Sequence, residues 1–187
     1  MAEILKLETV YQGWGKLMLA TVREDSGQEV HRQIEDHGQV TAVLPYDAER
    51  RVATLIRIAR APALYVGEQR DLIEPIAGLI DEGEDAATAA RREAMEEAGL
   101  RLGALEPVGV VFPSPGASAE RMTLFLAAYT PADRVGEGGG APGEDEHLQT
   151  FERPLAALWA AVEAGAVPDG KLLTLMLALR LRRPELF

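Results

Sequence analysis

The sequence predicts a protein of the α/β or α+β class, in which a mixed β-sheet lies between helices and a short antiparallel β-segment precedes it. One observation is the order of elements along the chain, namely strands, one helix, further strands and two helices. Another is the length of 187 residues with 47% apolar residues, which fits one cored domain with a small appendage. We therefore expect a β-strand segment at residues 1–40 and a main domain at residues 41–187.

Apolar, β-branched runs in the first part of the chain predict strands joined by hairpin turns. These runs are residues 16–25, 28–38, 39–47 and 50–60. Asp-Ser-Gly at 25–27 is a turn signal between the first two runs. Residues 62–78 are expected to continue as extended chain that ends in a loop. Residues 1–40 are too few to bury a core of their own, so we expect them to pack on the rest of the chain or on a second copy.

Residues 85–98 predict a helix, because alanines fill its interior and both ends carry capping residues. Asp85 is placed as the N-cap, and Gly99 follows the last residue as a C-cap. The later elements are predicted as strands at 105–116 and 121–130, a mobile glycine-rich loop at 133–147, and helices at 154–167 and 169–183.

Composition excludes several classes of function. A formal net charge of -11 argues against a protein that binds nucleic acid by neutralising its phosphates. The absence of cysteine excludes disulfides, thiolate nucleophiles and cysteine-ligated zinc. No apolar run reaches the length of a membrane span, and residues 1–13 lack the basic start and apolar block of a secretion signal. We therefore expect a cytoplasmic protein that binds neither nucleic acid nor membrane.

The predicted helix at 85–98 concentrates like charges on one side. Glu93 and Glu97 are four residues apart and Glu96 lies beside them, and each such pair costs a helix roughly 0.2–0.5 kcal/mol. The plainest interpretation is a solvated acidic face, with Arg91 and Arg92 offsetting part of the charge. A second interpretation is a metal site, because clustered carboxylates suit Mg²⁺ or Mn²⁺ better than zinc or copper.

The residues before and within the helix favour the metal site and carry a resemblance to a family. They fit the Nudix box, Gly-x5-Glu-x7-Arg-Glu-U-x-Glu-Glu-x-Gly-U, where U is apolar. The matching residues are Gly78, Glu84, Arg92, Glu93, Ala94, Glu96, Glu97, Gly99 and Leu100. Ala94 is smaller than the usual aliphatic residue, from which we expect looser helix packing. The resemblance implies the family's α/β/α sandwich with a mixed sheet.

The resemblance also implies a reaction, the hydrolysis of a nucleoside diphosphate linked to another group. Glu93 and Glu97 would be the main ligands of Mg²⁺, with Mn²⁺ as the alternative ion. Glu96 would assist them, and the backbone carbonyl of Ala77 would be a further ligand. The residues implied to orient these groups are Arg92, Glu84 and Gly78.

Outside the box, the chain resembles the branch of the family that contains ADP-ribose pyrophosphatases and GDP-mannose hydrolases. The loop at 114–121 carries Ser114 and Glu120, and Glu120 would hydrogen-bond sugar hydroxyls; the alternative is a plain turn with a solvated glutamate. In the glycine-rich stretch, Glu144 resembles the catalytic base and Glu146 an additional metal ligand, although the two roles are interchangeable at this point. The alternative for that stretch is a disordered acidic linker.

Two basic positions are further candidates for contact with the substrate. Lys171, at a predicted helix start, resembles a phosphate contact of the GDP-mannose hydrolases; an exposed turn lysine is the alternative. Arg60 is a candidate phosphate or sugar contact and Arg57 a weaker one. Ile58 stands where the branch often has glutamine, which separates this chain from the usual pattern.

The N-terminal segment resembles strands that, in this branch, pair with the partner subunit in a homodimer with exchanged strands. Arg32, Glu35 and Tyr11 are then candidate contacts across the interface, while an ordinary exposed arginine is the alternative for Arg32. Trp14 and Trp159 are expected to pack rather than to bind a ligand.

These features together predict a metal-dependent hydrolase that splits the pyrophosphate of a nucleoside diphosphate sugar into a nucleoside monophosphate and a sugar phosphate. ADP-ribose and GDP-mannose are the two candidate substrates. The alternatives are a hydrolase that removes damaged nucleoside triphosphates and a non-catalytic sensor of nucleotide sugars.

Overall fold

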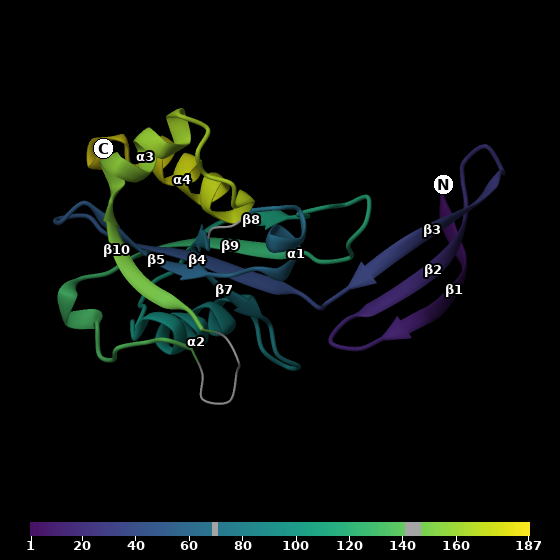
Figure 1. The fold of residues 1–187 in the computed structure, drawn as a ribbon, viewed down its shortest axis with the longest axis horizontal. Coiled ribbons are helices and arrows are strands. Elements are labelled where there is room, and N and C mark those ends of the chain that lie inside the picture. The colour runs from purple at the N-terminus through teal and green to yellow at the C-terminus, as the bar shows by residue number, and fades with distance from the viewer. Residues whose placement is uncertain (69–70, 141–146) are drawn as a thin grey trace. The chain divides into compact units, whose positions relative to one another are not determined.

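The computed structural model describes residues 1–68, 71–140 and 147–187, which form two compact units (Figure 1). The first unit contains Met1–Val40 and Val110–Met122. The second unit contains Thr41–Gly109 and Thr123–Phe187. Each unit therefore draws on two separate stretches of the chain.

The first unit is built on an antiparallel sheet of three strands in the order β1-β2-β3. The strands are β1 (Glu3–Gln12), β2 (Lys16–Arg23) and β3 (Glu29–Asp36). The hairpin predicted around 25–27 is confirmed as the connection between β2 and β3. The backbone of Glu35 also pairs with the loop at 117–119, through hydrogen bonds of 2.8 Å to Ala117 and Ala119. All ten residues of β1 are exposed.

The second unit is built on a mixed sheet of seven strands in the order β10-β5-β4-β9-β8, with β6 beside β5 and β7 beside β4. Its strands are β4 (Val40–Asp47), β5 (Val52–Ile58), β6 (Leu72–Glu74), β7 (Ile76–Leu79), β8 (Glu106–Val111), β9 (Met122–Ala128) and β10 (Gln149–Pro154). Its helices are α1 (Ala61–Tyr65), α2 (Ala86–Ala98), α3 (Leu155–Glu163) and α4 (Gly170–Arg182), with single turns η1 (Pro131–Asp133) and η2 (Pro184–Leu186).

Helices cover both faces of this sheet, with α2 on one face and α3 and α4 on the other (Figure 1). Successive residues of a strand point to opposite faces, so each central strand contributes to two cores. On one side, Val43, Ile56 and Phe125 form a buried cluster with the alanines of α2. On the other side, their neighbours Leu44 and Leu55 are fully buried as well. The predicted α/β/α sandwich is confirmed.

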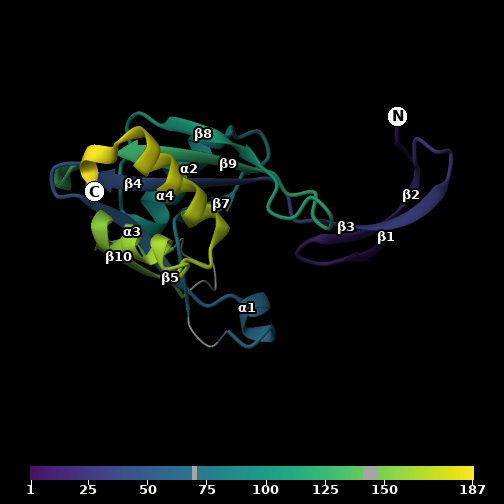
Figure 2. The ribbon, with the colours of Figure 1, turned by 90° about the horizontal axis from the view of Figure 1, so that it is seen from above.

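Two predictions of local structure are wrong. Residues 61–65 form the short helix α1 instead of extended chain, because Pro62 stands in the first turn, where its fixed φ favours a helix start. The helix has no buried residue, and Figure 2 shows it away from the other helices. Residues 149–154 form β10, which pairs with β5 along its whole length, although no strand was expected there. A short strand at the edge of a sheet is defined by its partner more than by its own sequence.

The helix α2 packs on the sheet through small residues. Ala89, Ala90, Ala94 and Ala98 have no more than trace exposure, and three of them belong to the buried cluster. The structure therefore buries Ala94 completely, where looser packing was expected. Within the described residues, no helix has the length and apolar composition that crossing a bilayer requires.

Replacing Ala94 by leucine should destabilise the protein. The larger side chain has no exposed surface to occupy, so it must displace the helix or the strands below it, at a cost of roughly 1–3 kcal/mol. In urea unfolding, A94L should have its midpoint at a lower urea concentration than the wild type. The control is A157L on the exposed face of α3, which should unfold as the wild type does. Equal midpoints for A94L and A157L would contradict close packing at Ala94.

Candidate active site

Helix α2 brings the glutamates of the acidic motif together at its C-terminal half, since residues three and four apart share a helix face. Asp85 accepts a hydrogen bond from the Thr88 N–H at 2.7 Å and so caps the helix start, as predicted. Gly99 ends the helix in the left-handed conformation, with a φ of 62°. The side chain of Glu97 is buried, with 3% of the residue exposed, which excludes a freely solvated acidic face at this position.

Arg92 is the centre of the carboxylate cluster. Its Nη1 donates to Glu93 Oε1 at 2.7 Å and to Glu96 Oε2 at 3.0 Å. Its Nε and Nη2 donate to the carboxylate of Glu84 at 3.3 and 3.0 Å, and Nη2 also donates to the Leu79 carbonyl at 2.9 Å. The hydrogen bonds from Arg92 lower the pKa of Glu84 below its ordinary value. One guanidinium thus orients three carboxylates, while its single charge is smaller than theirs combined.

Strand β7 meets two of the glutamates at Ala77 and Gly78. The Ala77 N–H donates to Glu97 Oε2 at 3.3 Å. A Cβ at Gly78 would lie 2.0 Å from Glu93 Oε1, so only glycine lets the Glu93 carboxylate approach the strand. The two carboxylates therefore lie beside adjacent residues of one strand, Glu97 at Ala77 and Glu93 at Gly78. Their oxygens are the hard ligands that Mg²⁺ and Mn²⁺ prefer, so the donor set fits such an ion.

The structure describes some of the candidate metal ligands and not others. Within residues 1–68, 71–140 and 147–187, no three His, Asp or Glu side chains are gathered closely enough to enclose a metal ion by themselves. Glu93, Glu96 and Glu97 share one helix end, where Arg92 bonds the first two. Glu144 and Glu146 lie outside the described residues. Their predicted roles stay predictions.

Arg60 and Lys171, two predicted substrate contacts from distant parts of the chain, meet at one buried glutamate. Arg60 binds Glu74 with two hydrogen bonds of 2.8 and 3.1 Å, and Lys171 Nζ lies 3.0 Å from the same carboxylate. Lys171 also donates at 2.7 Å to Asp169, which caps the start of α4. Burial alone would raise the pKa of Glu74, but the bonds from Arg60 and the charge of Lys171 outweigh it and lower that pKa. The two cations are thereby fixed side by side.

The other predicted substrate residues belong to the first unit. Ser114 begins a turn in which its carbonyl accepts from Ala117 and Ser118, and the Glu120 N–H donates to Ser118 Oγ at 3.1 Å. Arg32 is exposed and pairs with Glu24 at 3.3 Å. Arg32 lies on β3, and the loop that contains Ser114 and Glu120 pairs with the same strand through Ala117 and Ala119.

The two tryptophans differ from each other. Trp159 packs edge-on against Phe187, with ring centroids 5.8 Å apart, as expected of a packing residue. Trp14 is 80% exposed, and its ring is stacked on that of His37 at 4.8 Å. The expectation that Trp14 packs therefore holds only for this one ring contact.

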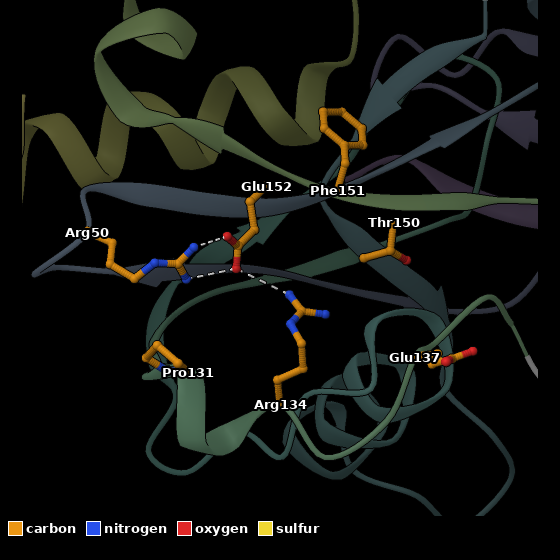
Figure 3. Close-up of a pocket in the computed structure, with 7 residues that line it drawn as sticks. All are labelled: Arg50, Pro131, Arg134, Glu137, Thr150, Phe151 and Glu152. Carbon is orange, nitrogen blue, oxygen red and sulfur yellow. Dashed lines mark hydrogen bonds and ion pairs between the residues drawn. The ribbon is translucent and has the colours of Figure 1, made fainter.

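An open pocket that the sequence did not indicate lies at β10 and the turn η1 (Figure 3). Its lining residues are Arg50, Pro131, Arg134, Glu137, Thr150, Phe151 and Glu152. Glu152 stands between two arginines: it accepts from Arg50 through both carboxylate oxygens and from Arg134 at 3.4 Å. It also accepts from the Tyr129 hydroxyl at 2.8 Å. The bonds from Arg50 hold the pKa of Glu152 at about 2.

Sequence patterns offer little signal for this pocket. Arg50 comes from the turn between β4 and β5, Arg134 follows η1, and Glu152 lies on the strand that was not predicted. The polar groups of the three side chains satisfy one another, so we interpret the cluster as a structural junction that ties η1 and β10 to the central sheet. Such ionic junctions form between distant segments and leave no local motif.

Comparisons with known proteins agree with this geometry. A model of the family described as NUDIX domain matches residues 36–175. The chain is 39% identical to the GDP-mannose pyrophosphatase of Cronobacter sakazakii over 153 residues, which cover 81% of this chain and 78% of that protein. It is 35% identical to the ADP-ribose pyrophosphatase of Escherichia coli K12 over 173 residues, which cover 89% of this chain and 82% of that protein.

A solved structure shares the fold. The crystal structure of an ADP compounds hydrolase superposes with a TM-score of 0.74 and covers 97% of this chain and 96% of its own. The sequence identity is 21%, so this similarity concerns the arrangement of helices and strands alone.

The ionic junction predicts a specific loss of stability with acidity. The pKa of Glu152 falls from about 4.5 in the unfolded chain to about 2 in the folded protein. The contribution of the ionised carboxylate to the free energy of unfolding is therefore complete above pH 4.5 and is lost as the pH falls toward 2. E152Q should therefore lower the free energy of unfolding at pH 7 by roughly 1–2 kcal/mol, a value that allows for solvent screening. Urea unfolding at a series of pH values measures it.

The control for this experiment is E49Q, which removes one charge from the exposed turn between β4 and β5. E152Q and the wild type should converge in stability near pH 2, while E49Q should follow the wild type throughout. A constant difference between E152Q and the wild type at all pH values would show that the charge of Glu152 is not what stabilises the junction.

Proposed function

The chain belongs to the NUDIX family, and we propose that it is a divalent-metal-dependent pyrophosphatase of nucleoside diphosphate sugars. The observation that carries the proposal is the cluster of carboxylates at the C-terminal half of α2. Arg92 binds Glu93 and Glu96, while Glu93 lies against Gly78 and Glu97 against Ala77. This arrangement collects more negative charge than its guanidinium offsets, which is the environment that a divalent cation stabilises. Such a cation would also offset the negative charge of a diphosphate substrate.

ADP-ribose and GDP-mannose are the substrates we propose. Relatives named for each of these substrates match most of the chain at similar identity. The proposal therefore starts from the chemistry that both substrates share. Each substrate joins a nucleoside to a sugar through a diphosphate. Hydrolysis breaks one P–O bond of the diphosphate bridge, adds the oxygen of water to phosphorus, and yields a nucleoside monophosphate and a sugar phosphate.

The residues of α2 and β7 supply the metal site in this proposal. Glu93 and Glu97 hold Mg²⁺, or Mn²⁺, together with the carbonyl of Ala77, and Glu96 assists them. A bound divalent ion offsets phosphate charge, acts as a Lewis acid on the phosphoryl oxygens and lowers the pKa of water. Arg92 keeps the carboxylates oriented, with Glu84 as its anchor. Support comes from the burial of Glu97 and the close approach of Glu93 to Gly78.

Further roles are proposed from the family resemblance. Glu144 accepts the proton of the attacking water, and Glu146 adds a metal ligand. Arg60 and Lys171 contact phosphate, which their fixed side-by-side position on Glu74 supports. Ser114 and Glu120 contact the sugar, and Arg32 reaches the substrate from a partner subunit. Those last three residues lie in the first unit.

We also propose that the first unit forms a homodimer by exchange of its strands. The cross-strand register puts most of the apolar side chains of the three-stranded sheet on one face, together with Thr9 and Arg32. The apolar residues of this face are Ile4, Leu7, Met18, Ala20, Val22, Val30 and Ile34. Ile4 and Leu7 are 58% and 51% exposed. An apolar sheet face with an exposed edge strand favours association with a second chain.

Leu7→Asp should separate the dimer into monomers. The aspartate puts a charge between the apolar residues Ile4 and Met18 of this face, where a partner subunit would have to bury it. Sedimentation velocity at micromolar concentration should show a dimer for the wild type and a monomer for L7D. The matched control is Gln33→Asp, on the opposite face of the same sheet, which should remain dimeric. A monomeric wild type would reject the proposed dimer.

A product assay tests the proposed activity. The purified protein is incubated with Mg²⁺, or with Mn²⁺, and with ADP-ribose, GDP-mannose, ADP-glucose, NADH or 8-oxo-dGTP, and the released monophosphate is quantified. We expect AMP from ADP-ribose or GMP from GDP-mannose as the fastest reaction. Faster turnover of 8-oxo-dGTP would replace the proposal by a triphosphate hydrolase, and no turnover of any compound would favour a non-catalytic sensor.

Glu97→Gln is the variant that links this activity to the metal site. It should lower turnover by more than the roughly 100-fold that a residue outside the metal's ligand shell costs. E49Q serves again as the control for a lost carboxylate. Full activity in E97Q would reject the proposed metal ligands while leaving the substrate assignment intact.

A further inference from the structure

The position of Glu96 and Glu97 at the end of α2 raises an electrostatic problem. The last carbonyls of a helix have no partner within it and carry a partial negative charge, so acidic side chains there are unfavourable. The last turn of α2 contains no basic residue. Two carboxylates and the backbone carbonyls therefore place like charges together, and something outside the helix must satisfy the carbonyls.

Donors from the segment that follows η1, and one donor from β10, satisfy the carbonyls of the two glutamates themselves. The Gly139 N–H donates to the Glu97 carbonyl at 2.9 Å, and the Gly140 N–H donates to the Glu96 carbonyl at 3.1 Å. The Thr150 hydroxyl, from β10, also donates to the Glu97 carbonyl. The backbone of Glu97 is thus held from two elements.

The same segment satisfies the next two carbonyls. Arg134 Nη1 donates to the Ala98 carbonyl at 2.8 Å. Val135 and Gly136 donate to the Gly99 carbonyl at 2.8 and 3.2 Å. We call the six donors the C-terminal clamp: Arg134, Val135, Gly136, Gly139, Gly140 and Thr150. The clamp supplies four backbone N–H groups, a hydroxyl and a guanidinium to one helix end.

Two glycines make this close approach sterically feasible. A Cβ at Gly138 would lie 2.2 Å from the Glu97 carbonyl oxygen, and a Cβ at Gly99 would lie 2.1 Å from the Gly136 carbonyl oxygen. Both glycines also adopt positive φ, 75° at Gly138 and 62° at Gly99. A side chain at Gly138 would therefore push the segment away from the backbone of Glu97.

The clamp is fixed to the central sheet as well as to the helix. Thr150 lies on β10 in register with Ile56 of β5. Arg134 reaches from the helix end to Glu152 and Thr54, at 3.4 and 3.5 Å, and so belongs to the ionic junction in Figure 3. The end of α2 is consequently tied to the middle strands through both its apolar face and its last carbonyls.

We propose that the C-terminal clamp is a positioning device for the metal-binding glutamates. It holds the backbone of Glu96 and Glu97 so that the Glu97 carboxylate stays beside Ala77 and the Glu96 carboxylate beside Arg92. The inference rests on the proposed function, because it takes these glutamates as metal ligands. Arg134, Thr150 and Gly138 act through α2 and do not contact the ion. Loosening the clamp should weaken metal binding while the fold remains.

Direct measurement of Mn²⁺ binding without substrate tests the clamp. Electron paramagnetic resonance of free Mn²⁺ gives the dissociation constant for each variant. Gly138→Ala should raise that constant about 10-fold or more, the range found when groups behind metal ligands are changed. Its control is Gly165→Ala, because Gly165 has a similar φ of 66° but open space around its Cβ. G165A carries the same backbone strain and should bind Mn²⁺ within about twofold of the wild type.

A second pair of variants keeps the test valid if G138A fails to fold. Thr150→Val preserves shape and strand propensity but removes the donor to Glu97, whereas Thr150→Ser keeps the hydroxyl. T150V should bind Mn²⁺ several-fold more weakly, and T150S should match the wild type. Circular dichroism and urea unfolding verify that each variant is folded.

The outcomes separate this inference from the function on which it rests. Mn²⁺ affinity in T150V and folded G138A equal to that of the wild type would overturn the clamp and leave the metal site intact. A wild-type protein that binds no Mn²⁺ would overturn both. Weaker binding in T150S and G165A to the same degree as in T150V and G138A would show a general loss of packing and would also overturn the clamp.

Discussion

Concentration of negative charge at the end of one helix is the constraint on which the second unit depends. Glu93, Glu96 and Glu97 stand within five residues of each other, and the helix end adds its own partial negative charge. The chain resolves this conflict with groups brought from far away in sequence. Arg92 binds the side chains of Glu93 and Glu96, while the segment after η1 and the strand β10 bind the carbonyls. The glycine-rich stretch and the edge strand thus complete the hydrogen bonding of the acidic helix.

Small residues on α2 and β7 determine how closely the helix approaches the sheet. Alanines on the sheet side let the helix backbone lie close to β4 and β5, which brings Glu97 within reach of the backbone of β7. A larger residue on that side would lift the carboxylates away from Ala77 and Gly78. Gly78 completes the arrangement, because Glu93 occupies the volume that a side chain would need. Small residues on both elements therefore set where the carboxylates stand.

How much of this could be predicted from the sequence depends on the range of the interactions. The helix and its caps at Asp85 and Gly99 are local features, and the pattern of the acidic motif lies within a single stretch, so both were predicted correctly. The partner of Arg60 and Lys171 is Glu74, which no motif marks, and their pairing requires α4 to pack beside β6. Two donors to the carbonyls of Glu96 and Glu97, Gly139 and Gly140, lie in a stretch that has no periodicity in the sequence. The third donor, Thr150, lies on the strand β10, which was not predicted. Hydrogen bonds between backbone groups leave no side-chain pattern, apart from the glycines that permit them.

Charge pairing also explains how a chain with a net charge of -11 could act on an anionic diphosphate. Arg92, Arg60, Lys171, Arg50 and Arg134 each bind carboxylates of the chain, so much of their positive charge is compensated internally. Paired in this way, these side chains contribute little net attraction for an anion. In the proposed function, attraction of the diphosphate therefore depends on a divalent ion, which the carboxylates of α2 would bind. On this proposal, the acidic helix and the anionic substrate are linked through the divalent ion that both would bind.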